Sequence, residues 1–123
     1  MIEVEYLDLD DLLGLVRALR TGPVRDVGLL DSAAARPPSH VFGEEACPTL
    51  PLTAAALLHS LARNHPLVDG NKRLGWLATV VVLDLNASEP DVSDAAAFQL
   101  VMDVAAGAAD VEEIADRLRV VPR

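Results

Sequence analysis

The sequence predicts an all-α protein, and three observations support this fold class. Half of the 123 residues are hydrophobic (51%), and much of that fraction is alanine, leucine and valine. Aromatic residues make up only 3% of the chain, whereas the strands of β-sandwiches are usually rich in them. Capping residues, glycines and prolines also divide the chain into segments of helical length. We expect one domain over residues 1–123, a compact bundle around a central buried helix.

The N-terminal part is predicted to contain two helices and a loop. Asp8 or Asp10 can cap a first helix that runs to about Arg20, where a Gly-Pro pair follows. A second, short helix is expected over Asp26–Ala35 and ends before two prolines. Proline, serine, histidine and glycine dominate residues 36–50, so we expect an exposed loop that can hold a short hairpin.

The middle of the chain is predicted to form two buried helices joined by a tight loop. Pro51–Asn64 has a proline suited to the first helical turn, followed by an almost entirely apolar run. The loop His65–Gly70 breaks this helix, because Pro66 disfavours helical geometry just before it. Asn71 is expected to cap the next helix, which reaches about residue 86 and is apolar nearly all round, as a central helix would be.

Two further helices are expected near the C-terminus. Ser93 or Asp94 can cap the first, which reaches about Ala106, and Asp110 can cap the second. The second helix has acidic residues in its first turn and arginines in its last, an order that suits the helix dipole. This charge order requires no functional explanation.

Composition argues against several classes of function. A formal net charge of -9 is unlike that of a general nucleic-acid binder or of a protein that anchors to anionic lipid. Cys47 is the single cysteine, so an internal disulfide is excluded and a structural zinc site is not expected. Residues 1–11 do not resemble a signal peptide, and the apolar stretch at residues 74–83 is too short to span a bilayer. We therefore expect a cytoplasmic protein with neither membrane nor direct nucleic-acid partner.

The start of the central helix carries two cations. Lys72, the only lysine in the chain, and Arg73 follow Gly70 and Asn71. Free backbone N–H groups already give a helix start a partial positive charge, so two exposed cations there are unfavourable by about 0.3–1 kcal/mol each. An anion at the helix start removes this penalty, and phosphate groups are the natural ligands of such a start. The alternative is that both side chains simply point into water.

Two neighbouring side chains favour the phosphate hypothesis. Asp69 offers a carboxylate oxygen where Mg²⁺ would bind through one or two carboxylates and the phosphates themselves. His65, at the other end of the loop, has a side chain able to accept a proton near neutral pH. Taken singly, Asp69 would more often belong to a turn and His65 to a helix C-cap. Together with the cations they suggest phosphoryl or nucleotidyl transfer.

The same nine residues resemble the signature loop of the Fic/Doc family, specifically its Doc (death on curing) toxin branch. The segment is His65-Pro66-Leu67-Val68-Asp69-Gly70-Asn71-Lys72-Arg73. Flanking segments also look similar: residues 26–37 resemble the helix before the family's flap, residues 54–64 the helix leading into the loop, and residues 115–118 the closing segment. The nine-residue motif is specific, and the flanking similarity is supportive.

The resemblance implies an activity and a set of roles. His65 would be the general base, and Asp69 would hold Mg²⁺. Gly70, Asn71, Lys72 and Arg73 would bind the phosphates of ATP, and Arg63 is a further candidate for phosphate binding that could equally pair with a surface acid. Doc toxins are kinases that transfer the γ-phosphate of ATP to a threonine of elongation factor Tu and stop translation. A partner antitoxin with a disordered segment folds onto the toxin and blocks it.

Two alternatives remain open at this point. Adenylylating Fic enzymes have glycine where Lys72 stands, so AMP transfer is the second enzymatic hypothesis. The family also usually has phenylalanine at the position of Leu67 and often threonine at that of Leu74, so a non-catalytic binding module with this fold is the third hypothesis. Leu67 can fill much of the missing volume, and we expect a loosened loop with reduced activity.

Other polar and aromatic residues have weaker assignments. His40 and Phe42 fall in the expected flap, which by resemblance would position the target segment. His59 lies in an apolar helical stretch and is expected to be a hydrogen-bonded core residue. Cys47 is expected to be inert, and Trp76 to belong to the core.

Overall fold

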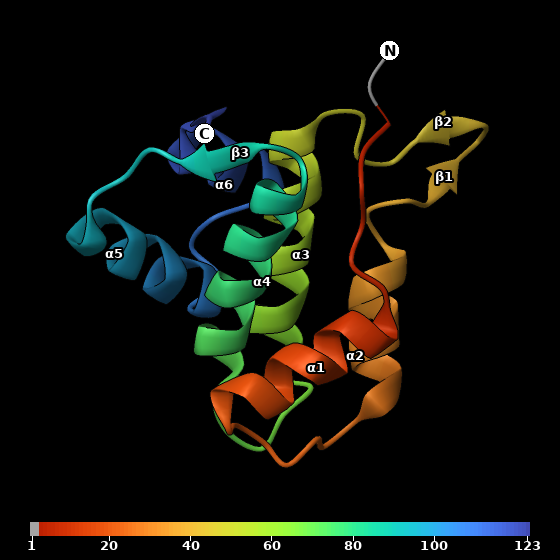
Figure 1. Cartoon of the computed structure of the whole chain (residues 1–123), viewed down its shortest axis with the longest axis vertical. Helices are drawn as coiled ribbons and strands as arrows, with labels where there is room; N and C mark the ends of the chain where they lie inside the picture. The colour runs from red at the N-terminus through yellow and green to blue at the C-terminus, as the bar shows by residue number, and fades with distance from the viewer. Residues whose placement is uncertain (1–2) are drawn as a thin grey trace.

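The computed structural model describes residues 3–123 and confirms an all-α fold (Figure 1). Met1 and Ile2 lie outside the described residues. They belong to residues 1–11, the stretch that was compared with a signal peptide in the sequence. The elements, in chain order, are α1 (Leu9–Leu19), α2 (Val27–Ala35), β1 (His40–Val41), β2 (Glu44–Glu45), α3 (Leu50–Asn64), α4 (Asn71–Leu85), β3 (Ser88–Pro90), α5 (Asp94–Ala105), α6 (Val111–Leu118) and β4 (Val120–Pro122).

An antiparallel pair of helices, α3 and α4, forms the middle of the molecule (Figure 1). α3 contacts α2, α4, α5 and α6, and an uninterrupted run of side chains from Thr53 to Leu58 is buried. The sequence pattern placed α4 at the centre, and this was only partly right. Leu74, Ala78 and Val82 of α4 face the core, but its opposite face is only half-buried. The core is therefore built around α3 with α4 beside it.

Helix boundaries follow the capping residues closely. Asp8, Asp26, Thr49, Ser93 and Asp110 each accept a hydrogen bond from a backbone N–H in the first turn of the helix that follows. The exception is α4, whose N-cap is Gly70 and which has no side-chain cap. The prediction that Asn71 caps this helix was wrong, because Asn71 is its first helical residue and its side chain is engaged elsewhere.

Two antiparallel ribbons of two short strands complete the fold. β1 and β2 form the hairpin expected in the loop before α3. β3 and β4 pair from Ser88–Pro122 to Pro90–Val120 and join the end of α4 to the C-terminus, a contact that the sequence pattern did not predict. The strands have only two or three residues each, so the fold class is unchanged.

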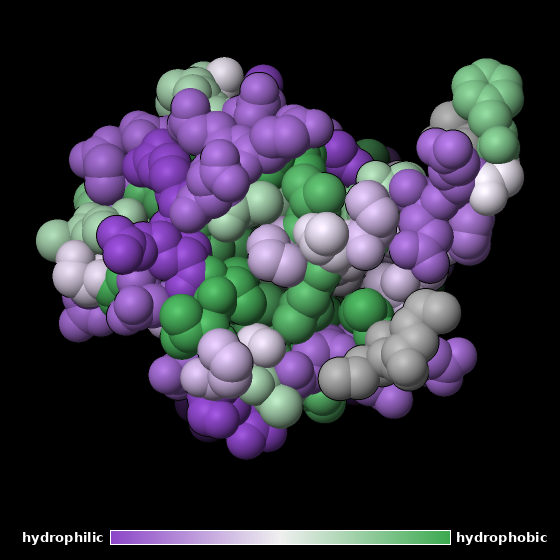
Figure 2. Space-filling model, turned by 90° about the horizontal axis from the view of Figure 1, so that it is seen from above, coloured by the Kyte–Doolittle hydropathy of each residue, from purple (hydrophilic) through white to green (hydrophobic). Residues whose placement is uncertain are grey.

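The hairpin and the loop after α3 lie at opposite ends of that helix (Figure 1). α3 has 15 residues, which corresponds to a length of about 22 Å. Figure 2 looks onto the hairpin end, where the hairpin projects to one side of a face whose hydrophobic middle is surrounded by hydrophilic residues. Within residues 3–123, no helix is long and apolar enough to cross a membrane.

Candidate functional site

The loop between α3 and α4, residues 65–70, is held by the segment that joins α1 to α2. Leu67 forms an isolated antiparallel bridge with Val24, and the Val68 N–H donates to the Pro23 carbonyl over 2.9 Å. The Gly22 N–H donates to the Asp69 carbonyl over 3.1 Å. We call residues 65–73 the motif loop and residues 21–26 the linker. The linker fixes the path of the motif loop through backbone contacts with residues 66–69.

Asn71 fixes the motif loop from within. Its side-chain oxygen accepts from the Leu67 N–H at 2.9 Å, and its side-chain nitrogen donates to the Leu67 carbonyl at 3.0 Å. Asn71 is itself buried, and the Leu67 side chain is 1% exposed within the main core. Leu67 therefore anchors the loop in the core, as the family's phenylalanine would be expected to do.

Gly70 is required by both space and backbone geometry. Its φ of +91° lies in the left-handed region, and an added Cβ would stand 2.5 Å from a methyl carbon of Thr21. The absence of a side chain thus allows the linker and the start of α4 to pack against each other.

The first turn of α4 presents unpaired donors. The first helical hydrogen bond runs from the Leu74 N–H to the Gly70 carbonyl, and the N–H groups of Asn71, Lys72 and Arg73 find no acceptor among residues 3–123. The side chains of Lys72 and Arg73 are exposed and form none of the ion pairs found in this part of the chain. The first turn of α4 thus has three N–H groups without an acceptor and carries two cations without an ion pair among the described residues, the arrangement that favours an anion.

His65 and Asp69 lie at the two ends of the same loop. His65 is the C-cap of α3 in the left-handed conformation (φ 53°, ψ 59°), and its side chain is exposed. The Asp69 side chain is exposed as well and takes part in no ion pair within the described residues. The structure therefore presents a potential base and a potential metal ligand to solvent beside the free α4 start.

Asp69 offers one exposed carboxylate to a divalent cation at the motif loop. Among residues 3–123 there is no cluster of three or more histidine, cysteine, aspartate or glutamate side chains that could bind a metal. A single free carboxylate such as that of Asp69 fits Mg²⁺, which keeps several waters and binds through one or two carboxylates plus substrate phosphates. The residues present are thus compatible with a metal that arrives with a nucleotide.

Other candidate residues lie outside this group. Arg63 donates to the Ala105 carbonyl at the end of α5 over 3.0 Å, and its guanidinium packs against Gly107. His40 and Phe42 are exposed in the hairpin at the far end of α3, so the structure does not bring them to the motif loop. The role of Arg63 in phosphate binding stays a prediction.

The remaining weak candidates have structural roles. His59 is hydrogen-bonded as expected, with Nδ1 3.1 Å from the Arg36 guanidinium, although it is only half-buried. Burial raises the pKa of the Cys47 thiol more than the charge of Arg36 lowers it, which fits an inert cysteine. Trp76 is half-buried rather than enclosed in the core.

Trp76 lines an open apolar groove between α4 and α5. The groove has a volume of about 630 Å³, and Lys72 and Arg73 also line it. Phe98, whose side chain is 68% exposed, and Met102 project from α5 into the same groove. The free cations of the α4 start therefore adjoin an exposed apolar surface.

One residue at the motif loop was missed by the sequence interpretation. Arg25, in the linker, donates from Nε to the His65 carbonyl at 2.8 Å and from a terminal nitrogen to the Asn64 carbonyl at 3.1 Å. Nothing in the sequence distinguishes it from the other arginines, because the contact joins positions 40 residues apart.

Comparison with known proteins agrees with this geometry. Residues 6–83, which contain the linker, the motif loop and most of α4, match the model of the Fic/DOC family. The chain is also similar to Toxin Doc of Mycolicibacterium smegmatis (strain ATCC 700084 / mc(2)155), with 47% identity over 120 residues that cover 93% of this chain and 91% of the relative. Both matches span the region that holds the free helix start. The chain belongs to the Fic/DOC family.

Proposed function

We propose that this protein is a toxin that transfers the γ-phosphate of ATP to a serine or threonine hydroxyl of a target protein. The observation that carries the proposal is the start of α4. It is the one helix start among the described residues without a side-chain cap, and it carries two unpaired cations and no acidic residue. A helix start of this kind is suited to hold phosphate groups.

The motif loop supplies the groups that hold the phosphates. The backbone N–H groups of Asn71, Lys72 and Arg73 would donate to phosphate oxygens, and both cationic side chains would balance their charge. The Asn71 side chain is already hydrogen-bonded to the Leu67 backbone. Asn71 would therefore bind a phosphate oxygen through its backbone N–H and not through its side chain. Asp69 would hold Mg²⁺, which when bound neutralises the charge that develops on the phosphates.

His65 is assigned to the proton transfer. Its imidazole accepts the proton of the target hydroxyl while the hydroxyl oxygen forms a bond to the γ-phosphorus. The bond between that phosphorus and the oxygen bridging to the β-phosphate breaks, and ADP leaves. The products are a phosphorylated target, ADP and a proton on His65. The exposure of His65 allows a macromolecular target to approach it.

Lys72 supports phosphate transfer over AMP transfer. In the adenylylating relatives a glycine occupies its position, and by resemblance the lysine accompanies a reversed nucleotide that presents its γ-phosphate to the target. A compact ammonium group suits a single phosphate better than a broad guanidinium does. By the same resemblance we propose elongation factor Tu as the target, with inhibition of translation in the cytoplasm as the result.

We also propose that a partner antitoxin neutralises the protein. The support on this molecule is the groove between α4 and α5, where exposed Phe98 and Met102 adjoin Lys72 and Arg73. An exposed apolar surface of this kind is suited to a protein segment. A segment that folds into the groove would cover both cations and so block phosphate binding. The variant Phe98→Asp should then escape neutralisation by the antitoxin while keeping its toxicity.

The proposal is tested by incubating the protein with labelled ATP, Mg²⁺ and purified elongation factor Tu or a translation extract, followed by mass spectrometry of the target. We expect a gain of one phosphate on a serine or threonine, loss of transfer in chelator, and a decrease of about 10²–10⁴-fold in His65→Ala. A gain of AMP would replace the kinase proposal with adenylylation.

Growth of bacteria expressing the variants tests the non-catalytic alternative. If His65→Ala inhibits growth as strongly as the parent, catalysis is not the toxic act. In that case the protein would be a binding module that retains the family's fold.

A further inference from the structure

We propose that Arg25 is a positioning residue for His65: its guanidinium fixes the backbone turn from which the imidazole projects. This inference rests on the proposed function for its effect on catalysis. Its structural half, that Arg25 determines the orientation of His65, can be tested without any activity.

The contacts of Arg25 are concentrated on the two residues that end α3. Its Nε donates to the His65 carbonyl at 2.8 Å, and its terminal nitrogen donates to the Asn64 carbonyl at 3.1 Å. Its own backbone N–H donates to the Pro66 carbonyl at 2.8 Å. Arg25 therefore contacts the residue before His65, His65 itself and the residue after it.

These contacts are made where the backbone needs support. The last carbonyls of a helix have no partner within it, and a guanidinium can satisfy two of them with charge-assisted hydrogen bonds. His65 also adopts a left-handed conformation, which for a residue with a Cβ is unfavourable by about 1–2 kcal/mol. Arg25 stabilises this turn by donating to the carbonyls on both sides of the His65 α-carbon.

Within the described residues, His65 is held through its backbone and not through its side chain. The imidazole is exposed, and no hydrogen bond within residues 3–123 reaches it. The point from which the imidazole projects is consequently set by the backbone of His65, and Arg25 is the side chain that donates to this backbone. Because Arg25 acts on carbonyl oxygens and not on the reacting atoms, it should affect the rate of transfer and leave nucleotide binding nearly unchanged.

The chain offers a matched control in Arg123. Its Nε lies 2.7 Å from the Asp84 carboxylate, and its terminal nitrogen donates to the Asp84 carbonyl at 3.2 Å. This exposed guanidinium thus makes two contacts at the end of α4 that is remote from the motif loop. A general effect of losing an arginine at a helix end would appear in both variants.

The experiment compares Arg25→Ala, Arg25→Lys and Arg123→Ala by kinetics and by NMR of the imidazole groups. We expect Arg25→Ala to reduce kcat by about 10–100-fold through misplacement of the base, and to change the KM for ATP by less than about threefold. Arg25→Lys should recover part of the rate, and Arg123→Ala should match the parent. With only three histidines in the chain, the His65 resonances can be assigned from His65→Ala.

The NMR spectra decide the structural half of the inference. The His65 ring resonances should shift in Arg25→Ala and remain in place in Arg123→Ala. Unchanged His65 resonances, or equal losses of kcat in both alanine variants, would overturn the inference. If the parent transfers nothing from ATP, the proposed function fails, and the His65 resonances still decide whether Arg25 orients this side chain.

Discussion

Two helix starts in this molecule, those of α4 and α6, are opposites in charge and in hydrogen bonding. At α6 the Asp110 carboxylate accepts from the Glu113 N–H at 2.8 Å, and two acidic residues occupy the first turn. At α4 a left-handed glycine stands in the cap position, and the first turn holds Lys72 and Arg73. The first start is satisfied by its own residues, whereas the second leaves its donors and its cations free.

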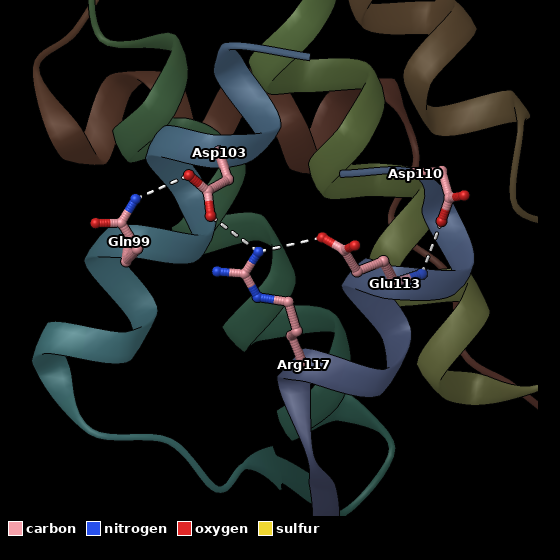
Figure 3. A network of polar contacts seen from close by, with 5 residues as sticks. All are labelled: Gln99, Asp103, Asp110, Glu113 and Arg117. Atoms are coloured by element: carbon pink, nitrogen blue, oxygen red, sulfur yellow. Dashed lines mark hydrogen bonds and ion pairs between the residues drawn. The ribbon is translucent and has the colours of Figure 1, made fainter. Parts of the chain in front are cut away.

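The surroundings of the two helices extend this contrast. Figure 3 shows Arg117 of α6 between Asp103 of α5 and Glu113, with distances of 2.9 and 3.2 Å. A hydrogen bond from Gln99, together with one from Arg117, lowers the pKa of Asp103 below its ordinary value. Every charged group in that view has a partner. The charges at α6 therefore stabilise the fold, and those at α4 are available for a ligand.

The variant Lys72→Ala should separate function from stability most clearly. We expect transfer to fall by about 10²–10³-fold, because a group placed to meet transition-state charge is removed. The melting temperature should stay the same or rise slightly, since an exposed cation at a helix start is unfavourable by about 0.3–1 kcal/mol. Differential scanning calorimetry beside the transfer assay checks both. A clear fall in melting temperature would mean that Lys72 supports the fold.

Asp110→Ala should produce the reverse pattern at α6. Loss of a side-chain N-cap destabilises a protein by about 0.5–2 kcal/mol, which corresponds to a fall in melting temperature of about 2–8 °C. Transfer by the folded variant should equal that of the parent. If transfer fell as far as in Lys72→Ala, the division of roles between the two helix starts would be wrong.

A smaller effect is expected from His59, which lies in α3 between these regions. Burial, followed by the charges of Arg36 and Arg63, lowers the pKa of His59 below its ordinary value of 6.5. The unfolded state then binds more protons, so the unfolding free energy should decrease as the pH falls from about 7.5 to 5.5. His59→Asn keeps an acceptor for Arg36 without the titrating ring and should weaken this dependence. Denaturant titrations at several pH values measure it, and identical slopes for both proteins would exclude His59 as the cause.

Local patterns in the sequence predicted the parts of the fold that local chemistry determines. The helices that begin after Asp8, Asp26, Ser93 and Asp110 do so because each of these side chains can bond the N–H three residues later. The two cations of the motif loop could also be recognised from the local sequence, because positive side chains in the first turn are opposite to the usual charge order of a helix.

A competing local partner and several long-range contacts explain what the sequence did not reveal. Asn71 is a common capping residue, but here its side chain is bound to both polar groups of the Leu67 backbone. Arg25 reaches the end of α3 across 40 positions of the chain, and β3 pairs with β4 although α5 and α6 lie between them in the sequence. The Arg25 contacts and the β3–β4 pairing depend on the assembled fold, so no local pattern contains them.

The central claim, that the start of α4 binds phosphate groups, is tested most directly by NMR titration of the parent with ATP and Mg²⁺. We predict large shifts of the backbone N–H signals of Asn71, Lys72 and Arg73, with the signals of the first turn of α6 unchanged as an internal reference. Signals at α4 that stay in place at saturating nucleotide, or that move no more than those at α6, would contradict the claim.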